Sequence, residues 1–93
     1  MEKFDDLEFD KFLDGIIARA VYGDYELSVA KHSGSYGGSN GLYEIGVFKG
    51  DEMVEMPGIT QEGDTVKGFL TEENVTGIMK KMISITASEG EQS

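Results

Sequence analysis

The sequence predicts a single α+β domain with the order α-β-β-β-α. An antiparallel sheet of three or four strands follows an N-terminal helix and precedes a C-terminal helix, and both helices lie on one face of the sheet. Apolar residues recur with helical spacing near both ends of the chain, side chains alternate with a period of two between them, and 93 residues are too few for two cores. We expect one domain over residues 1–93, frayed at 1–5 and 87–93.

Residues 6–22 carry the pattern that predicts the first helix. Asp5 and Glu8 are spaced like an N-terminal cap and its reciprocal partner, and Gly23 is a typical C-terminal stop. The apolar residues fall on one stripe of a 3.6-residue repeat. They are Phe9, Phe12, Leu13, Ile16, Ile17, Ala20 and Val21.

Alternation with a period of two predicts strands at Tyr25–Lys31 and Leu42–Lys49. Residues 32–41, which read H-S-G-S-Y-G-G-S-N-G, have no periodicity, so we interpret them as a mobile connection. Three further features follow in chain order: a tight turn at Gly50-Asp51, a third strand at about 52–56 and a short extended piece at 65–70.

The last element is predicted to be a helix that begins after Thr71, which is a typical N-cap residue. Glu72 and Glu73 in the first turn and Lys80 and Lys81 near the end match the helix dipole. Its apolar stripe consists of Val75, Ile78, Met79, Met82 and Ile83.

Composition excludes several classes of function. The chain has 18 Asp and Glu against 8 Lys and Arg, a net charge of −10, which disfavours nucleic acid or an anionic membrane as a direct partner. It has no Cys and a single His, so the usual zinc and triad sites lack their parts. We therefore expect no enzyme, no catalytic residue, no metal and no cofactor. The start of the chain is acidic and no apolar run is long enough to span a bilayer, so we expect a cytoplasmic protein.

The glycine-rich segment 32–41 allows three interpretations. A phosphate-binding loop requires a Lys and a following helix, and neither follows Gly41. A flexible connection is the simplest alternative. In the third interpretation Tyr36, an aromatic residue among small ones, contacts a partner. His32, at a strand end, is predicted to be solvated or hydrogen-bonded rather than catalytic.

The acidic residues form two groups. Asp6, Asp10 and Asp14 fall at i, i+4 and i+8 of the first predicted helix, a row with a rise of roughly 6 Å per step. Like charges at this spacing destabilise a helix, so helix stability does not explain the row. The second group surrounds the predicted turns of the sheet and consists of Asp51, Glu52, Glu55, Glu62 and Asp64. A solvated surface is the simpler interpretation of both groups.

Two acidic groups with few interspersed lysines would steer the domain towards a basic surface. Such a surface could be the nucleic-acid groove of a larger protein, because carboxylates spaced along a row imitate the phosphates of one DNA strand. Both acidic groups and Tyr36 are the predicted contacts. This hypothesis implies salt-sensitive binding in competition with DNA or RNA.

The chain resembles the small acidic proteins that bacteriophages encode to disable host systems, among them anti-CRISPR proteins and other DNA mimics. The similarity covers about residues 5–85 and lies in the N-terminal helix, the strand that begins Asp24-Tyr25-Glu26-Leu27-Ser28-Val29, the strand Leu42–Lys49, and Leu70-Thr71-Glu72-Glu73-Asn74-Val75 opening a helix. This resemblance implies inhibition by binding and assigns no functional residue.

The predicted function is a non-enzymatic, phage-type inhibitor that occludes a basic site on a host defence or nucleic-acid-processing protein. One alternative is a structural or accessory homo-oligomer that uses methionine and aromatic faces. The other is a small-ligand binder that uses the loop 32–41.

Overall fold

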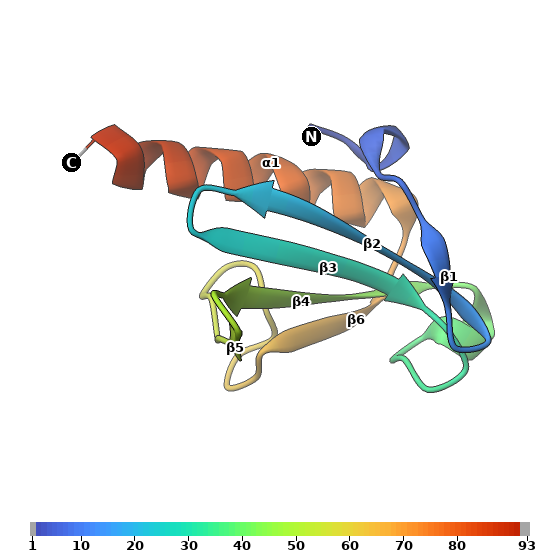
Figure 1. The fold of residues 1–93 in the computed structure, drawn as a ribbon. Helices are drawn as coiled ribbons and strands as arrows, with labels where there is room; N and C mark the ends of the chain where they lie inside the picture. The colour runs from blue at the N-terminus through green and yellow to red at the C-terminus, as the bar shows by residue number, and fades with distance from the viewer. Residues whose placement is uncertain (1, 92–93) are drawn as a thin grey trace.

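An antiparallel sheet with one long helix across one of its faces makes up the structure, a computed structural model that describes residues 2–91 (Figure 1). The strands are β1 (Asp10–Phe12), β2 (Gly15–Tyr22), β3 (Tyr25–Lys31), β4 (Tyr43–Lys49), β5 (Glu52–Met53) and β6 (Val66–Leu70). The helix is α1 (Glu72–Glu91), and 3-10 turns form η1 (Phe4–Asp6) and η2 (Gly38–Asn40). The strands lie in the order β1-β2-β3-β4, and both β5 and β6 pair with the remaining edge of β4.

The predicted α-β-β-β-α order is wrong, because residues 6–22 form the last residue of η1, then β1 and β2, rather than a helix. From Ala18 onward every second residue of β2 is buried, whereas Arg19 and Val21 are exposed. This is the period-two burial of a strand with one face in the core. Residues 2–91 therefore form one α-helix and a six-stranded sheet in place of two helices and three or four strands.

Two properties of the segment favour strands over the predicted helix. Gly15 and three β-branched residues, Ile16, Ile17 and Val21, have lower helix propensity than Ala or Leu. Gly23, the expected helix stop, is instead the first residue of a two-residue turn, Gly23-Asp24, that pairs Tyr22 with Tyr25. Helical spacing of the apolar residues is thus outweighed by pairing with β3 from Ile16 to Tyr22.

Three hairpins in the sheet share one kind of turn. The first residue of each two-residue turn has a positive φ, 53°, 60° and 65° in chain order. Glycine is favoured at this position because it has no Cβ. The turn dipeptides are Leu13-Asp14, Gly23-Asp24 and Gly50-Asp51, so leucine occupies the strained position in the first turn.

The core lies between α1 and one face of the sheet. Thr71 Oγ1 accepts a hydrogen bond from the backbone N–H of Asn74 at 3.1 Å, which confirms the predicted cap of α1. The apolar stripe of α1 is buried except for a partly buried Ile83. It packs with alternate residues of the sheet, among them Ala18, Ala20, Leu27, Val29, Ile45 and Val47.

The other predicted elements differ mainly in length. Tyr25–Lys31 is a strand as predicted, and the strand predicted from Leu42 begins at Tyr43. The third strand, expected at about 52–56, contains only two residues, and the extended piece at 65–70 is β6, a full member of the sheet. Of the ends expected to be frayed, residues 4 and 5 belong to η1 and 87–91 continue α1, while residues 1, 92 and 93 lie outside the described residues.

Candidate protein-binding surface

The three aspartates predicted to form a row lie on three different elements. Asp6 is in η1, Asp10 is in β1, and Asp14 is in the β1–β2 turn. The backbone N–H groups of Glu2 and Lys3 donate to Asp6 Oδ2 at 3.1 and 3.2 Å, and these bonds, the first above all, hold the pKa of Asp6 below its usual value. The row is absent because its helix is absent.

Asp14 connects the first hairpin to the glycine-rich segment. Its Oδ1 accepts a hydrogen bond from the backbone N–H of Ser33 at 3.0 Å, and hydrogen bonding from Ser33 lowers the pKa of Asp14. Further along, the N–H of Gly34 donates to His32 Nδ1 at 3.1 Å and the N–H of Tyr36 donates to Glu44 Oε2 at 3.3 Å. These N–H groups already have internal acceptors, unlike those of a phosphate-binding loop. The Tyr36 side chain is 58% exposed.

The five acids at the sheet turns lie at one end of the sheet, opposite the end that holds Asp14. Asp51 lies just after the C-terminal end of β4, which is Lys49. Asp14 lies just before β2, and the first residues of β2 pair with the C-terminal end of β3 (Figure 1). Since β3 and β4 are antiparallel, these two points are at opposite ends of the sheet. The structure brings the second acidic group together and separates it from Asp14.

Val47 holds together the two chain segments that carry the second group. Its C=O accepts a hydrogen bond from the N–H of Val54 at 2.9 Å, and its N–H donates to the C=O of Thr65 at 3.4 Å. Residues 51–55 and 62–65 therefore meet along the same edge of β4. Glu55 Oε2 then accepts a hydrogen bond from the N–H of Gly63 at 2.7 Å, which ties the two acidic segments to each other. We call Asp51, Glu52, Glu55, Glu62 and Asp64 the acidic end of the sheet.

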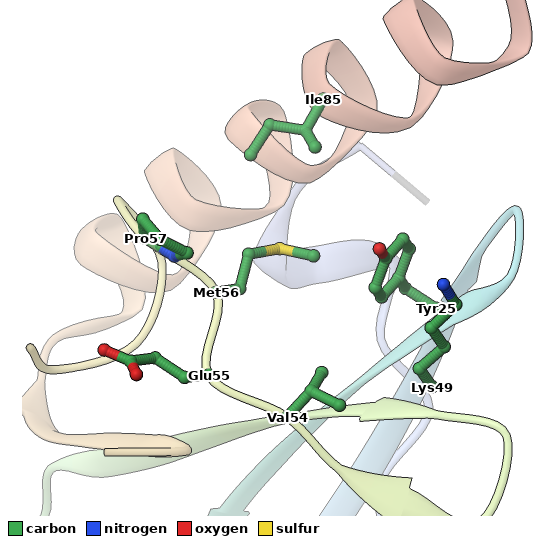
Figure 2. A pocket seen from close by; sticks show the side chains of 7 residues that line it. All are labelled: Tyr25, Lys49, Val54, Glu55, Met56, Pro57 and Ile85. Carbon is green, nitrogen blue, oxygen red and sulfur yellow. The ribbon is translucent and has the colours of Figure 1, made fainter. Parts of the chain in front are cut away.

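A pocket of about 360 Å³ opens beside the acidic end (Figure 2). Its lining comes from four parts of the chain: the start of β3, the end of β4, the segment after β5 and the last part of α1. The lining residues are Tyr25, Lys49, Val54, Glu55, Met56, Pro57 and Ile85. Glu55 belongs both to this pocket and to the acidic end, so the two features form one continuous surface.

Among the described residues, Lys49 is the only cation that lines this pocket. Its backbone pairs with Glu52 in the β4–β5 hairpin, yet its Nζ lies 5.5 Å from the centre of the Tyr25 ring instead of bonding to that carboxylate. The single ion pair that the structure records within residues 2–91 joins Arg19 and Glu26 at 2.9 Å. The carboxylates of the acidic end thus have no cationic partner among the described residues.

A larger hollow of about 480 Å³ lies between β6 and α1. Two lysines, Lys67 and Lys81, and one acid, Glu73, line it. Its charge does not match a basic partner, so we place the candidate surface at the acidic end. Sequence reasoning found the acids of this surface but not the pocket. The one signal for the pocket in the sequence is the pair Met56-Pro57 directly after a predicted strand. The other walls, Tyr25 and Ile85, reach this pair only in the folded structure.

Comparison of the chain with known protein families, with curated proteins and with solved structures gives no match. Within the described residues, no group of three or more His, Asp or Glu side chains is arranged to hold a metal ion. The one α-helix recorded there is not apolar enough to cross a bilayer.

Proposed function

We propose that this protein is a non-enzymatic inhibitor that binds a larger basic protein through the acidic end of the sheet and covers a nucleic-acid-binding surface. The kind of inhibitor is one that bacteriophages encode against a host defence or nucleic-acid-processing protein, acting in the host cytoplasm. One observation carries the proposal: five carboxylates gather at one end of the sheet without a cationic partner among the described residues.

Gathered carboxylates raise the energy of the folded protein, because like charges repel. A basic partner would relieve this repulsion and would be attracted over a distance comparable to the Debye length. The support comes from the charge of this surface and not from phosphate-like spacing, because the helical row of Asp6, Asp10 and Asp14 does not form. The helix-strand order behind the resemblance to phage inhibitors gives no support either.

The test compares two variants that each lose five carboxylates. The first carries Asp51→Asn, Glu52→Gln, Glu55→Gln, Glu62→Gln and Asp64→Asn. The matched control carries the corresponding amides at exposed acids elsewhere: Glu2, Asp5, Glu8, Glu72 and Glu73. Both variants have the same net charge, so a difference between them reports the position of the charge.

Each protein is used for affinity capture from bacterial lysate at low and high salt, and the captured protein is then challenged with its own DNA or RNA. We expect the wild type and the control to capture a basic protein at low salt, and the first variant to capture none. DNA or RNA should displace the captured protein. Equal capture by both variants, capture that is insensitive to salt, or a ternary complex with nucleic acid would contradict the proposal.

A homo-oligomer is the second candidate, favoured by exposed apolar residues on the helix-free face of the sheet. Val21 is 68% exposed and Met53 is 41% exposed. Light scattering after size exclusion tests this candidate. A monomer at about 100 µM, well above the micromolar dissociation constants of specific association, would leave it without support.

A further inference from the structure

The pocket beside the acidic end has the composition of a receptor for one side chain. We propose that it receives a single large apolar side chain from an extended segment of the basic partner, and that the neighbours of this anchor in the segment are Lys or Arg. This inference rests on the proposed function, since it names the part of the partner that the acidic end would recognise.

A large part of the pocket wall is apolar. Ile85 projects from α1 on one side, Pro57 and Met56 lie opposite, and Val54 lies below them, as Figure 2 shows. Ile85 and Val54 are partly buried and Met56 is buried, so their exposed parts are the surface that an inserted side chain would cover. Methionine is unbranched and adapts to the shape of what it contacts. About 360 Å³ holds one side chain the size of Leu, Met or Phe with room for its backbone.

Polar groups at the rim suit the backbone of such a segment. Lys49 Nζ lies over the Tyr25 ring, close to the apolar walls, and is a hydrogen-bond donor for a backbone carbonyl oxygen of the partner. On the other side of the pocket, Glu55 Oε2 accepts one bond from Gly63, and a carboxylate has lone pairs for further donors. The apolar pocket thus has a hydrogen-bond donor on one side and an acceptor on the other. This arrangement suits the C=O and N–H groups of a peptide backbone better than it suits a simple anion.

Charge selects the neighbours of the anchor. Glu55 lines the pocket, and Asp51 and Glu52 lie on the hairpin that leads into it. Acidic or neutral residues beside the anchor would leave the negative charge of these carboxylates unpaired. Lys or Arg on each side of the anchor would form ion pairs with them. A second copy of this chain is a poor occupant, because each copy carries a net charge of −10.

The experiment titrates the ¹⁵N-labelled protein with three synthetic peptides. The first peptide has one central Phe with four residues, alternately Lys and Arg, on each side. The second has Ser in place of Phe. The third keeps Phe and has Gln in place of every Lys and Arg. We expect chemical-shift changes at the pocket with the first peptide, binding about tenfold weaker with the second, and still weaker binding with the third.

Variants of α1 give the matched control. Ile85→Trp fills the pocket, whereas Ala87→Trp adds the same ring at an exposed position of α1 outside the pocket lining. We expect Ile85→Trp to bind the Phe peptide no better than the Ser peptide, and Ala87→Trp to bind both peptides like the wild type.

The outcomes separate the two proposals. Equal, salt-sensitive binding of the Phe and Ser peptides, unaffected by Ile85→Trp but lost in the five-amide variant of the acidic end, would overturn the anchor and keep the proposed function. Binding of no peptide would overturn the anchor alone, because capture of a basic protein from lysate tests the proposed function separately, whereas binding that survives the five-amide variant would overturn both. Shifts at the pocket on simple dilution of the protein would mean that a second copy is the occupant, and would also overturn the anchor.

Discussion

Glu55 Oε2 accepts a hydrogen bond of 2.7 Å from the backbone N–H of Gly63, eight residues further along the chain. Gly63 has a φ of +77°, a conformation that suits glycine, and it lies between two acids, Glu62 and Asp64. The bond closes a loop that has no strand or helix of its own between Val54 and Thr65. The position of two of the five acids therefore depends on a third.

Removal of this acceptor should loosen the loop. We expect Glu55→Ala to lower the free energy of unfolding by about 1 kcal/mol and to speed hydrogen exchange at the Gly63 amide, while Glu55→Gln retains an acceptor oxygen and loses less. Urea denaturation and amide exchange measure the two effects. Glu52→Ala is the control, since no hydrogen bond of its side chain is recorded. Unchanged exchange at Gly63 in Glu55→Ala would show that the bond does not hold the loop.

Leu13 occupies the first position of the β1–β2 turn with a φ of +53° and is 69% exposed. A side chain in this conformation costs roughly 1–2 kcal/mol, and glycine fills the same position in the other two hairpins. We expect Leu13→Gly to raise the free energy of unfolding by about 0.5–1 kcal/mol after the extra flexibility of glycine in the unfolded chain is included. Thermal unfolding measures it. Val21→Gly, at an exposed strand position, is the control and should be destabilising.

These hairpins show how far the sequence determines the fold. Gly50-Asp51 predicts a tight turn, and the structure has one there. Gly23-Asp24 carries the same signal, but the preceding residues also fit a helical repeat, so the sequence alone favours a helix stop at Gly23. Leu13-Asp14 lacks the glycine that signals a turn at the other two positions. Propensity and spacing are local properties, whereas the pairing of β2 with β3 depends on both segments at once.

The candidate surface was predictable to a similar extent. The acids of the sheet turns follow from turn positions in the sequence, and the structure places them at one end of the sheet. The pocket could not be predicted, because Tyr25 and Ile85 are 60 residues apart and meet only through the packing of α1 on the sheet. The prediction that Asp6, Asp10 and Asp14 form a row is wrong, because it required a helix over residues 6–22.

Asp14 should make stability depend on pH on the acid side. Hydrogen bonds from Ser33 lower its pKa, so the folded state binds this proton less readily than the unfolded state. The contribution is fully present above the ordinary Asp pKa of about 3.9 and is lost as pH falls through the lowered pKa. Asp14→Asn should remove the contribution of Asp14 to this pH dependence and leave that of Asp6, whose pKa is also lowered. Asp24→Asn, the corresponding change in the next turn, should keep it, as urea denaturation at pH 2–6 would show.

Tyr22 should make the free energy of unfolding depend on pH at basic pH. Burial raises the pKa of its phenol to about 12, with a smaller contribution from the charge of Asp6. The neutral phenol therefore contributes stability that is fully present below pH 10 and is lost as pH rises from 10 through about 12. We expect the wild type to lose on the order of 2 kcal/mol more than Tyr22→Phe over that range. Tyr36→Phe, which changes an exposed ring, should behave like the wild type.

Gly68 lets the glycine-rich segment lie against β6. A Cβ at Gly68 would meet the Cβ of Tyr36, and it would lie 2.8 Å from the C=O oxygen of Tyr36, the group that accepts a hydrogen bond from the N–H of Phe69. Backbone this close cannot yield without moving the segment.

We therefore expect Gly68→Ala to lower the free energy of unfolding by about 2 kcal/mol or more and to increase hydrogen exchange at Phe69. Gly77→Ala is the matched control, because a Cβ there has no neighbour within 4 Å and α1 gains helix propensity of about 1 kcal/mol. Opposite signs of the two changes in urea denaturation support the docked position of Tyr36. A neutral Gly68→Ala would mean that the segment is not held against β6 in solution, and Tyr36 would then have no fixed place from which to meet a partner.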